Sequence, residues 1–321
     1  NGMATTTASL ARADLEELEF DLDGAWKSLA RTALSDAKPA GPSDKLTGIY
    51  PKFTYALRPY LTPSFFDPDR PVRAEIGASL TAAYETRPGM IISGELRRPF
   101  YDTISDAVRV SDSVLPRVRT DGVRYAQESD IELTHLTAEY FFRPGENMYG
   151  RLTAGYLESM FGGVSAEVLW QPVNSRLALG AEVNYVKQRD FDMRLGFVSA
   201  YYDFDNGFQG QLDVGRYLAG DWGGTVTVNR AFKNGVKVGA FFTLTDVSFE
   251  DFGEGSFDKG ITIEIPIGYL SGDPSLNTFG QTIRTVQRDG GARLDIRNRL
   301  YDVTRGYRTP SMEDQWGKFW R

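Results

Sequence analysis

Cysteine is absent from this sequence, and histidine occurs only once, at position 135. The chain therefore has no disulfide, no thiolate metal ligand and no cysteine nucleophile. It also lacks any run of about 18 consecutive apolar residues, which a transmembrane helix would need. Basic residues are in the minority, with 36 Lys and Arg against 43 Asp and Glu, and the formal net charge of −7 argues against a nucleic-acid partner.

The first 48 residues follow a different pattern from the rest of the chain. Within residues 10–34, apolar side chains recur at the three- and four-residue spacing of a helix: Leu15, Leu18, Leu22, Trp26 and Leu29. The Pro- and Gly-rich stretch AKPAGPSDK then ends this pattern. We expect a helix here, followed by a linker.

From about residue 49 the apolar period changes to two, which is the period of a half-buried strand. In AEIGASLTAAYE and GITIEIPIGYL, apolar residues occupy alternate positions. Similar runs begin near residues 52, 89, 131, 148, 163, 177, 193, 208, 223, 235, 276 and 291. The pattern predicts about fourteen antiparallel strands, or about twelve as the alternative, each about ten residues long, as a tilted membrane-spanning strand needs.

Two observations favour an outer-membrane barrel over a soluble β-sandwich, which would also alternate. Aromatic residues gather near the predicted strand ends, as an interfacial girdle would: Tyr60, Tyr84, Phe100, Tyr140, Tyr149, Trp170, Tyr201, Phe208, Tyr217, Phe232 and Tyr269. Short turns such as RPGEN and FKNG alternate with longer loops such as residues 99–130 and DVSFEDFGEGSFDKG. We therefore expect an all-β transmembrane barrel over residues 49–301, with residues 1–48 periplasmic or plug-like and residues 302–321 as a periplasmic tail.

The side chains expected to face the lumen carry both signs of charge. By their alternate positions they are Glu75, Glu95, Arg97, Arg151, Glu167, Glu182, Arg194, Gln209, Gln211, Lys237 and Glu264. Such a wall can pair internally and plug the barrel, or it can line a hydrophilic passage, and the sequence leaves both open. The stretch GGARLDIRNRL, residues 290–300, has the Gly-x-x-apolar-x-apolar pattern of a last barrel strand.

The connection RYLAGDWGG, residues 216–224, holds a basic residue, two aromatics and a carboxylate between two predicted strands. If the long loops share one rim, these side chains and those of neighbouring loops could contact a glycan or a protein partner. The candidate contact residues are Arg216, Tyr217, Asp221, Trp222, Asp251, Asp258, Lys187, Arg189 and Asp190. The alternative is ordinary turn chemistry, which accounts well for Gly220, Asp221 and Gly223.

The sequence offers little for catalysis or metal binding. His135 lies in ELTHLTAEYFF at a position that should face the lumen beside Glu139, but no nucleophile motif such as G-x-S-x-G accompanies it. The acidic loop at 246–260 does not have the spacing of an EF-hand. We expect no catalytic residue, no metal site and no cofactor.

Several unusual segments, in order, resemble the YjbH family. They are GYLESMFGGVSAEVLWQP, LALGAEVNYVKQRDFD, VGRYLAGDWGGTVTVNRAFKNGVKVGAFFTLTDVSFEDFGEGSFDKGITIEIP and VQRDGGARL, and the resemblance spans roughly residues 148–305. Members of that family are Gram-negative outer-membrane proteins tied to exopolysaccharide or capsule production, and many are lipoproteins of about twice this length. The resemblance implies a pathway, and it carries over no catalytic residue.

Together these observations predict a non-enzymatic β-barrel of the Gram-negative outer membrane that supports exopolysaccharide or capsule assembly or export. The expected partners are outer-membrane lipid and lipopolysaccharide, a polysaccharide chain and periplasmic export proteins. A passive porin for small solutes is the main alternative, and an outer-membrane hydrolase built on His135 is a further one.

Overall fold

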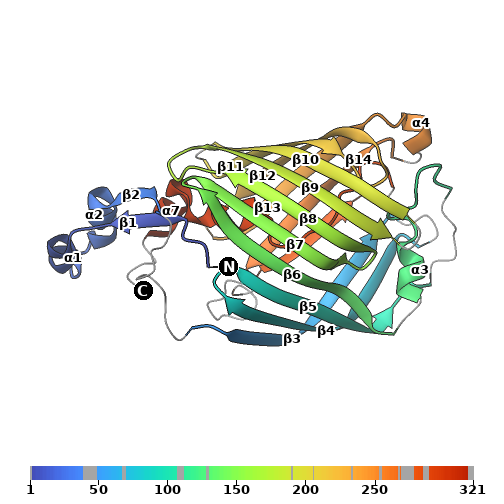
Figure 1. Cartoon of the computed structure of the whole chain (residues 1–321), viewed down its shortest axis with the longest axis horizontal. Helices are drawn as coiled ribbons and strands as arrows, with labels where there is room; N and C mark the ends of the chain where they lie inside the picture. The colour runs from blue at the N-terminus through green and yellow to red at the C-terminus, as the bar shows by residue number, and fades with distance from the viewer. Residues whose placement is uncertain are drawn as a thin grey trace.

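The fold is dominated by one sheet of thirteen antiparallel strands that follow each other in chain order. The computed structural model describes residues 2–38, 49–66, 70–106, 112–127, 130–188, 191–204, 206–232, 234–252, 255–266, 268, 278–284 and 289–316. The sheet curls until its last strand lies against its first, so that it forms a nearly closed barrel (Figure 1).

The strands match the predicted period-two runs closely. They are β3 (Lys52–Phe65), β4 (Val72–Arg87), β5 (Met90–Asp102), β6 (Glu132–Gly145), β7 (Met148–Glu158), β8 (Phe161–Trp170), β9 (Leu177–Gln188), β10 (Phe191–Asp203), β11 (Phe208–Arg216), β12 (Trp222–Ala231), β13 (Lys237–Thr245), β14 (Asp258–Pro266) and β15 (Thr278–Arg284). The predicted strand that begins near residue 291 is wrong, because residues 291–299 pair with no strand.

Alternation sorts the side chains into an inner and an outer face. Every strand exposes at least one large apolar side chain on the outer face: Leu57, Leu80, Ile92, Leu136, Leu152, Val164, Val183, Val198, Leu212, Val228, Phe242, Ile261 and Phe279. The inner face carries buried polar groups, among them Glu95, Arg151, Glu167, Glu182 and Asp213. Large apolar side chains exposed along a whole sheet in this way are unusual for a soluble protein.

The structure corrects some of the predicted orientations. Arg194, expected in the lumen, points outward and lies over the Tyr185 ring at 5.9 Å. Tyr149, Tyr201 and Tyr217, expected in an outer girdle, are buried inside the barrel. Tyr60 also faces inward, where it contacts Arg97 and Glu75, and Tyr269 lies outside the described residues. Tyr149, Tyr201 and Tyr217 lie within two residues of a strand end, whereas Tyr60 lies inside β3. A position near a predicted strand end does not fix which face of the sheet a side chain occupies.

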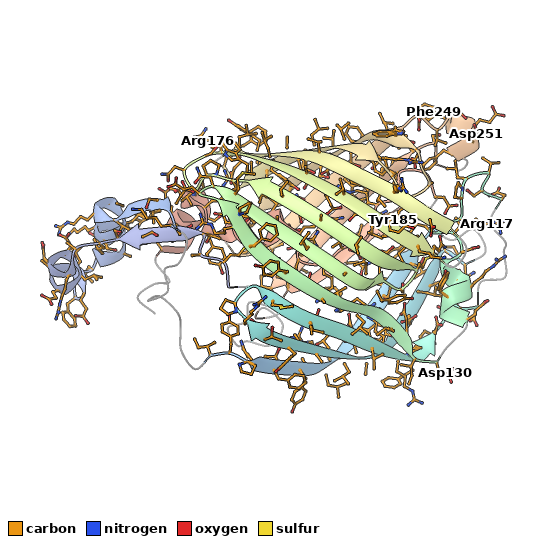
Figure 2. The ribbon with its side chains drawn as sticks, viewed as in Figure 1. Arg117, Asp130, Arg176, Tyr185, Phe249 and Asp251 are labelled. Atoms are coloured by element: carbon orange, nitrogen blue, oxygen red, sulfur yellow. The ribbon has the colours of Figure 1, made fainter. Side chains whose placement is uncertain are left out.

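The two ends of the barrel differ. At one end, which we call the turn end, neighbouring strands are joined by short turns in which Gly89, Gly207 and Gly235 have positive φ angles of 82°, 81° and 89° that favour glycine. At the other, the loop end, lie longer connections that include α3 (Gly122–Gln127) and α4 (Phe249–Phe252). Figure 2 shows Arg176 at the turn end, and Arg117 and Asp251 at the loop end.

The described elements near both ends of the chain lie at or beyond the turn end (Figure 1). The N-terminal part contains β1 (Thr6–Ser9), α1 (Arg12–Leu18), α2 (Gly24–Arg31) and β2 (Ala33–Asp36), and the C-terminal part contains α6 (Leu300–Thr304), a 3-10 helix (Arg305–Tyr307) and α7 (Thr309–Gln315). The indole N–H of Trp316 donates to Ser28 Oγ at 3.0 Å and so joins the two parts. No described helix is long and apolar enough to span a membrane.

The N-terminal helix predicted within residues 10–34 is interrupted. Residues 19–23 form a turn between α1 and α2, in which the Asp23 N–H donates to Asp21 Oδ1 at 3.1 Å. A Cβ on Gly24 would lie 2.3 Å from the Leu18 carbonyl oxygen. The close approach at Gly24 therefore fixes a sharp bend that apolar spacing alone does not reveal.

Candidate functional site in the barrel lumen

Residues 289–309, which we call the lumen segment, run through the barrel from the loop end to the turn end. At the loop end, Asp289 accepts hydrogen bonds from the backbone N–H groups of Arg119 and Thr120 at 2.8 and 3.0 Å. The Leu218 N–H donates to the Ala292 carbonyl at 2.9 Å. Asp289 is fully buried, so the start of the segment is held by two separate loops.

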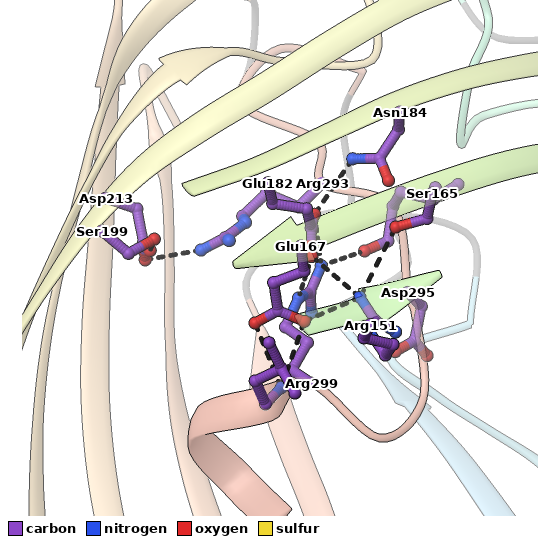
Figure 3. Close-up of polar contacts among 12 residues, drawn as sticks. Arg151, Ser165, Glu167, Glu182, Asn184, Ser199, Asp213, Arg293, Asp295 and Arg299 are labelled. Atoms are coloured by element: carbon purple, nitrogen blue, oxygen red, sulfur yellow. Dashed lines mark hydrogen bonds and ion pairs between the residues drawn. The ribbon is translucent and has the colours of Figure 1, made fainter. Parts of the chain in front are cut away.

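Halfway along the barrel, arginines of the lumen segment meet carboxylates of the wall (Figure 3). Arg299 donates through Nε to Glu182 at 3.0 Å, and Arg293 contacts Asp213 at 2.5 Å. Glu167 accepts the Leu300 N–H at 3.1 Å. These contacts come from β8, β9 and β11, so the segment is bound by several strands at once.

Arg151 of β7, a wall residue, contacts both the wall carboxylates and the lumen segment. Its side chain is fully buried and lies 2.9 Å from Glu167 and 3.4 Å from Glu182. It also donates to the Arg297 carbonyl at 2.8 Å. Burying an arginine with two carboxylates costs free energy unless the guanidinium N–H groups find acceptors. The lumen segment supplies one of these acceptors, the Arg297 carbonyl.

The charges of the segment complement those of the wall. Arg297 lies 3.6 Å from Glu95, and Asn298 donates to Glu139 at 2.8 Å. Together with the Arg293 and Arg299 pairs, these contacts place a cationic or amide group opposite carboxylates on β5, β6, β9 and β11. The sequence left open whether the mixed wall pairs internally or lines a passage. In the structure its carboxylates on these strands pair with the chain's own segment.

Apolar packing holds the segment at both ends. Near the loop end, Ala292, Leu294 and Ile296 join a buried cluster with Phe161 and Phe197 of the wall. Toward the turn end, Tyr301 stacks on Tyr201 with ring centroids 3.8 Å apart. Thr309 N–H then donates to the Val173 carbonyl at 3.2 Å, beside a short turn.

The loop RYLAGDWGG divides its side chains between the lumen and the outside. Asp221 is buried and accepts the Gly291 N–H at 2.8 Å, while Tyr217 is buried beside Phe197 and bonds Thr225 at 2.6 Å. Burial raises the pKa of Asp221, and the Gly291 N–H opposes that shift. Asp221 and Tyr217, which sequence predicted as contacts for a glycan or partner, therefore contact the lumen segment or the buried cluster around it.

The other predicted rim residues lie elsewhere. Arg216, Trp222 and Lys187 point outward from the ends of β11, β12 and β9. Asp251 is exposed on α4, where it accepts the Ser248 hydroxyl at 2.7 Å (Figure 2), and Asp258 lies 3.4 Å from Arg284. Arg189 and Asp190 lie outside the described residues. The structure thus does not bring the seven described residues of this set together in one site.

His135 is buried on the inner face, as expected, but its nearest carboxylate is Glu95 at 3.9 Å rather than Glu139. Glu95 of β5 lies directly opposite His135 in the register, whereas Glu139 is four residues further along the same strand as His135, about 13 Å away at the usual rise of a strand. In the part of the chain that the structure describes, no group of three or more His, Asp or Glu side chains could hold a metal ion.

The fold and the lumen together define a class: an antiparallel β-barrel with an apolar outer face and a lumen occupied by its own C-terminal segment. Comparison with known proteins identifies the family. A family model named YjbH, with the description "Exopolysaccharide biosynthesis protein YbjH", matches residues 1–306. This chain belongs to that family. The match extends beyond the region from about residue 148 that carries the resemblance in the sequence.

One relative is considerably longer than this chain. The "Uncharacterized lipoprotein YjbH" of Escherichia coli (strain K12) is 34% identical over 287 residues, which cover 83% of this chain and 41% of the relative. The chain thus spans about two fifths of the length of that relative.

Proposed function

We propose that this chain is an outer-membrane β-barrel that supports the assembly or export of an exopolysaccharide and does not itself catalyse a reaction. The observation that carries the membrane part is the outer face, on which all thirteen strands expose large apolar side chains. In water such a surface would be unfavourable by about 25 cal/mol for each Å² of apolar area. In a bilayer it is the surface expected of a transmembrane barrel. The family supports the pathway part.

The content of the lumen argues against the passive porin. A porin needs a hydrophilic passage, whereas here the carboxylates of β5, β6, β9 and β11 are paired with Arg293, Arg297, Arg299 and Asn298. The hydrolase gains no support either, because the groups near His135 are Thr134, Glu95 and arginines rather than an activated nucleophile. A structural or docking role agrees both with the apolar outer face and with the occupied lumen.

The orientation follows from the two ends. Outer-membrane barrels have short periplasmic turns and longer extracellular loops. The turn end, with β1, α1, α2 and β2 beyond it, therefore faces the periplasm in this proposal, and the loop end with α4 faces the cell exterior. The N-terminal part would then be available to periplasmic export proteins.

One experiment tests orientation and pathway together. A protease site is placed either in the 246–260 loop or in the 232–235 turn, and each variant is expressed in cells that lack the native copy. Both variants are expected to restore exopolysaccharide release, but added protease should cut only the first on intact cells. Cleavage is read from immunoblots, with permeabilised cells as the control for site accessibility.

The two parts of the proposal fail separately in this experiment. Cleavage of only the 232–235 site on intact cells would reverse the orientation. Unchanged exopolysaccharide in cells that lack the chain would contradict the pathway, whatever the protease shows.

A further inference from the structure

An apolar groove of about 1170 Å³ crosses the outer face of β6–β12. Its volume exceeds the roughly 300–1,000 Å³ typical of sites for drug-sized ligands. Small residues form part of its base: Ala154 on β7, Ala166 on the adjoining β8 and Gly196 on β10, with the bulkier Val183 of β9 directly between Ala166 and Gly196. The outer face is lower at these three positions because side-chain volume is missing there.

Cations line this groove only toward the loop end. Arg216 pairs in register with Gly196, and Arg194 lies two residues before Gly196 on the same outward face. Diagonal neighbours on one face of a sheet are within reach of long side chains. Arg194 and Arg216 are thus diagonal neighbours on adjacent strands at one end of an apolar surface, about 7–8 Å apart along the sheet.

Neither guanidinium has a carboxylate partner among the described residues. Arg194 lies over the Tyr185 ring, which Figure 2 shows on the wall nearest the viewer, and Arg216 donates to the Gly220 carbonyl at 3.1 Å. Lys187, which follows Tyr185 on the same face of β9, adds a third cation, and its amine is 4.0 Å from Asp192. Like charges placed side by side repel each other unless an anion binds between them.

We infer that the groove binds a phosphorylated, multiply acylated glycolipid of the outer leaflet, with the chemistry of the lipid A part of lipopolysaccharide. The acyl chains lie in the trough over Ala154, Ala166 and Gly196, and the phosphates are held by Arg194 and Arg216. Guanidinium binds phosphate in a bidentate manner. Trp222, exposed at the edge of the groove, offers an aromatic face to the sugar of the headgroup.

The position of the cations selects this lipid over a glycerophospholipid. The proposed orientation puts the loop end, and with it Arg194 and Arg216, at the outer leaflet; the inference rests on the proposed function in this respect. Two adjacent guanidinium groups suit a headgroup with two phosphates better than one with a single phosphodiester. The wide trough also suits a lipid with more than two acyl chains.

The test uses the purified full chain in detergent micelles, with diphosphoryl lipid A, monophosphoryl lipid A or phosphatidylglycerol added. Native mass spectrometry counts the bound lipid. Wild type is expected to retain one diphosphoryl lipid A, and Arg194→Gln with Arg216→Gln should weaken binding by about tenfold or more, because two charge-assisted contacts with phosphate are lost. Ala166→Leu should weaken it with all cations intact, since the added side chain fills the trough.

Matched controls separate a specific site from general charge or packing. Arg230→Gln removes an outward-facing arginine of β12 at the turn end, where it contacts Phe208 and Phe232; it should leave lipid A binding unchanged. Ala82→Leu, on the outer face of β4 away from the groove, is the control for Ala166→Leu.

Each other outcome overturns the inference. Equal binding by the double glutamine variant would show that these arginines hold no phosphate, and equal binding of phosphatidylglycerol would show that the site does not select lipid A. Because binding is measured in micelles, these results are independent of the protease experiment. A reversed orientation in cells would overturn the proposed function without altering the binding data.

Discussion

Replacing Arg299 by alanine is expected to lower the free energy of unfolding of the barrel by about 3 kcal/mol. Breaking a buried ion pair costs about 3–5 kcal/mol, because the remaining charge stays buried without its partner. Arg299 keeps 21% of its side-chain surface exposed, whereas Glu182 keeps only 6%, so the lower end of that range applies. In the variant, Glu182 would still have Arg151 as a partner at 3.4 Å, and this remaining ion pair also limits the loss of stability.

The measurement is equilibrium unfolding in urea of the chain refolded into lipid vesicles. A double-mutant cycle of Arg299→Ala with Glu182→Ala should give a coupling energy within about 0.5–3 kcal/mol, as residues in one ion-pair network do. Arg305→Ala is the matched control from the same segment. Its partner Asp302 is 62% exposed at 4.0 Å, so the loss should stay within about 1 kcal/mol. Additive single-variant effects would mean that Arg299 and Glu182 do not interact.

A lysine in place of Ile263 should destabilise the inserted barrel by about 2–4 kcal/mol, the range for a basic residue on the lipid face near the bilayer midplane. Ile263 lies on the outer face of β14, opposite Val238 of β13, which is exposed on the same face. Ile265→Lys should act in the same direction. Both are measured as the free energy of unfolding and as refolding yield in lipid vesicles.

The residue between them supplies the control. Glu264 faces inward and lies 2.8 Å from Lys237, with both side chains about one third exposed. Glu264→Lys removes a partly solvated ion pair and should cost about 1 kcal/mol or less beyond the local repulsion. If all three lysines were equally damaging, the outer face of β14 would not be a lipid face.

The strands could be predicted from sequence because each has one apolar and one polar face. Thirteen runs of period two correspond to thirteen strands, although boundaries and the orientation of single residues such as Arg194 required the structure. An even number of strands, fourteen or twelve, would return the chain to the end at which β3 begins. With thirteen strands the chain leaves β15 at the loop end, and it returns to the turn end through the lumen.

The lumen segment was misread as a strand for a physical reason. In ARLDIRNR the apolar residues Leu294 and Ile296 alternate with Arg293, Asp295 and Arg297, which is the pattern of a barrel strand. Here the apolar face packs against the buried cluster near the loop end, and the arginines meet wall carboxylates. A period of two shows only that the two faces of a segment meet different surroundings. The same pattern results whether those surroundings are the outside and the lumen of a barrel or two parts of one lumen. One signal in the sequence could have indicated the difference: the segment is rich in arginine, whereas the predicted inner face of the other strands is rich in carboxylates.

The rim residues were harder to place than the strands, because no sheet pairing in a loop fixes which side chains point inward. Asp221 and Tyr217 turn inward, whereas Arg216 and Trp222, at the adjoining strand ends, turn outward. Sequence showed that the loop carried unusual chemistry. It could not show that one half of the loop contacts the lumen segment and the other half borders the apolar groove on the outer face.

The path of the lumen segment can be measured directly with two engineered disulfides, because the chain has no cysteine of its own. Leu218→Cys with Ala292→Cys probes the loop end, and Val173→Cys with Thr309→Cys probes the turn end. Each pair shares a backbone hydrogen bond, of 2.9 and 3.2 Å respectively. That contact brings the two residues within the roughly 4.4–6.8 Å between Cα atoms that a disulfide spans.

Both disulfides are expected to form under mild oxidation of the folded barrel, seen as shifts in gel mobility that reductant reverses. If residue 292 instead joined Thr282→Cys of β15 and neither predicted disulfide formed, the segment would be a wall strand, and the account of a self-filled lumen would be wrong.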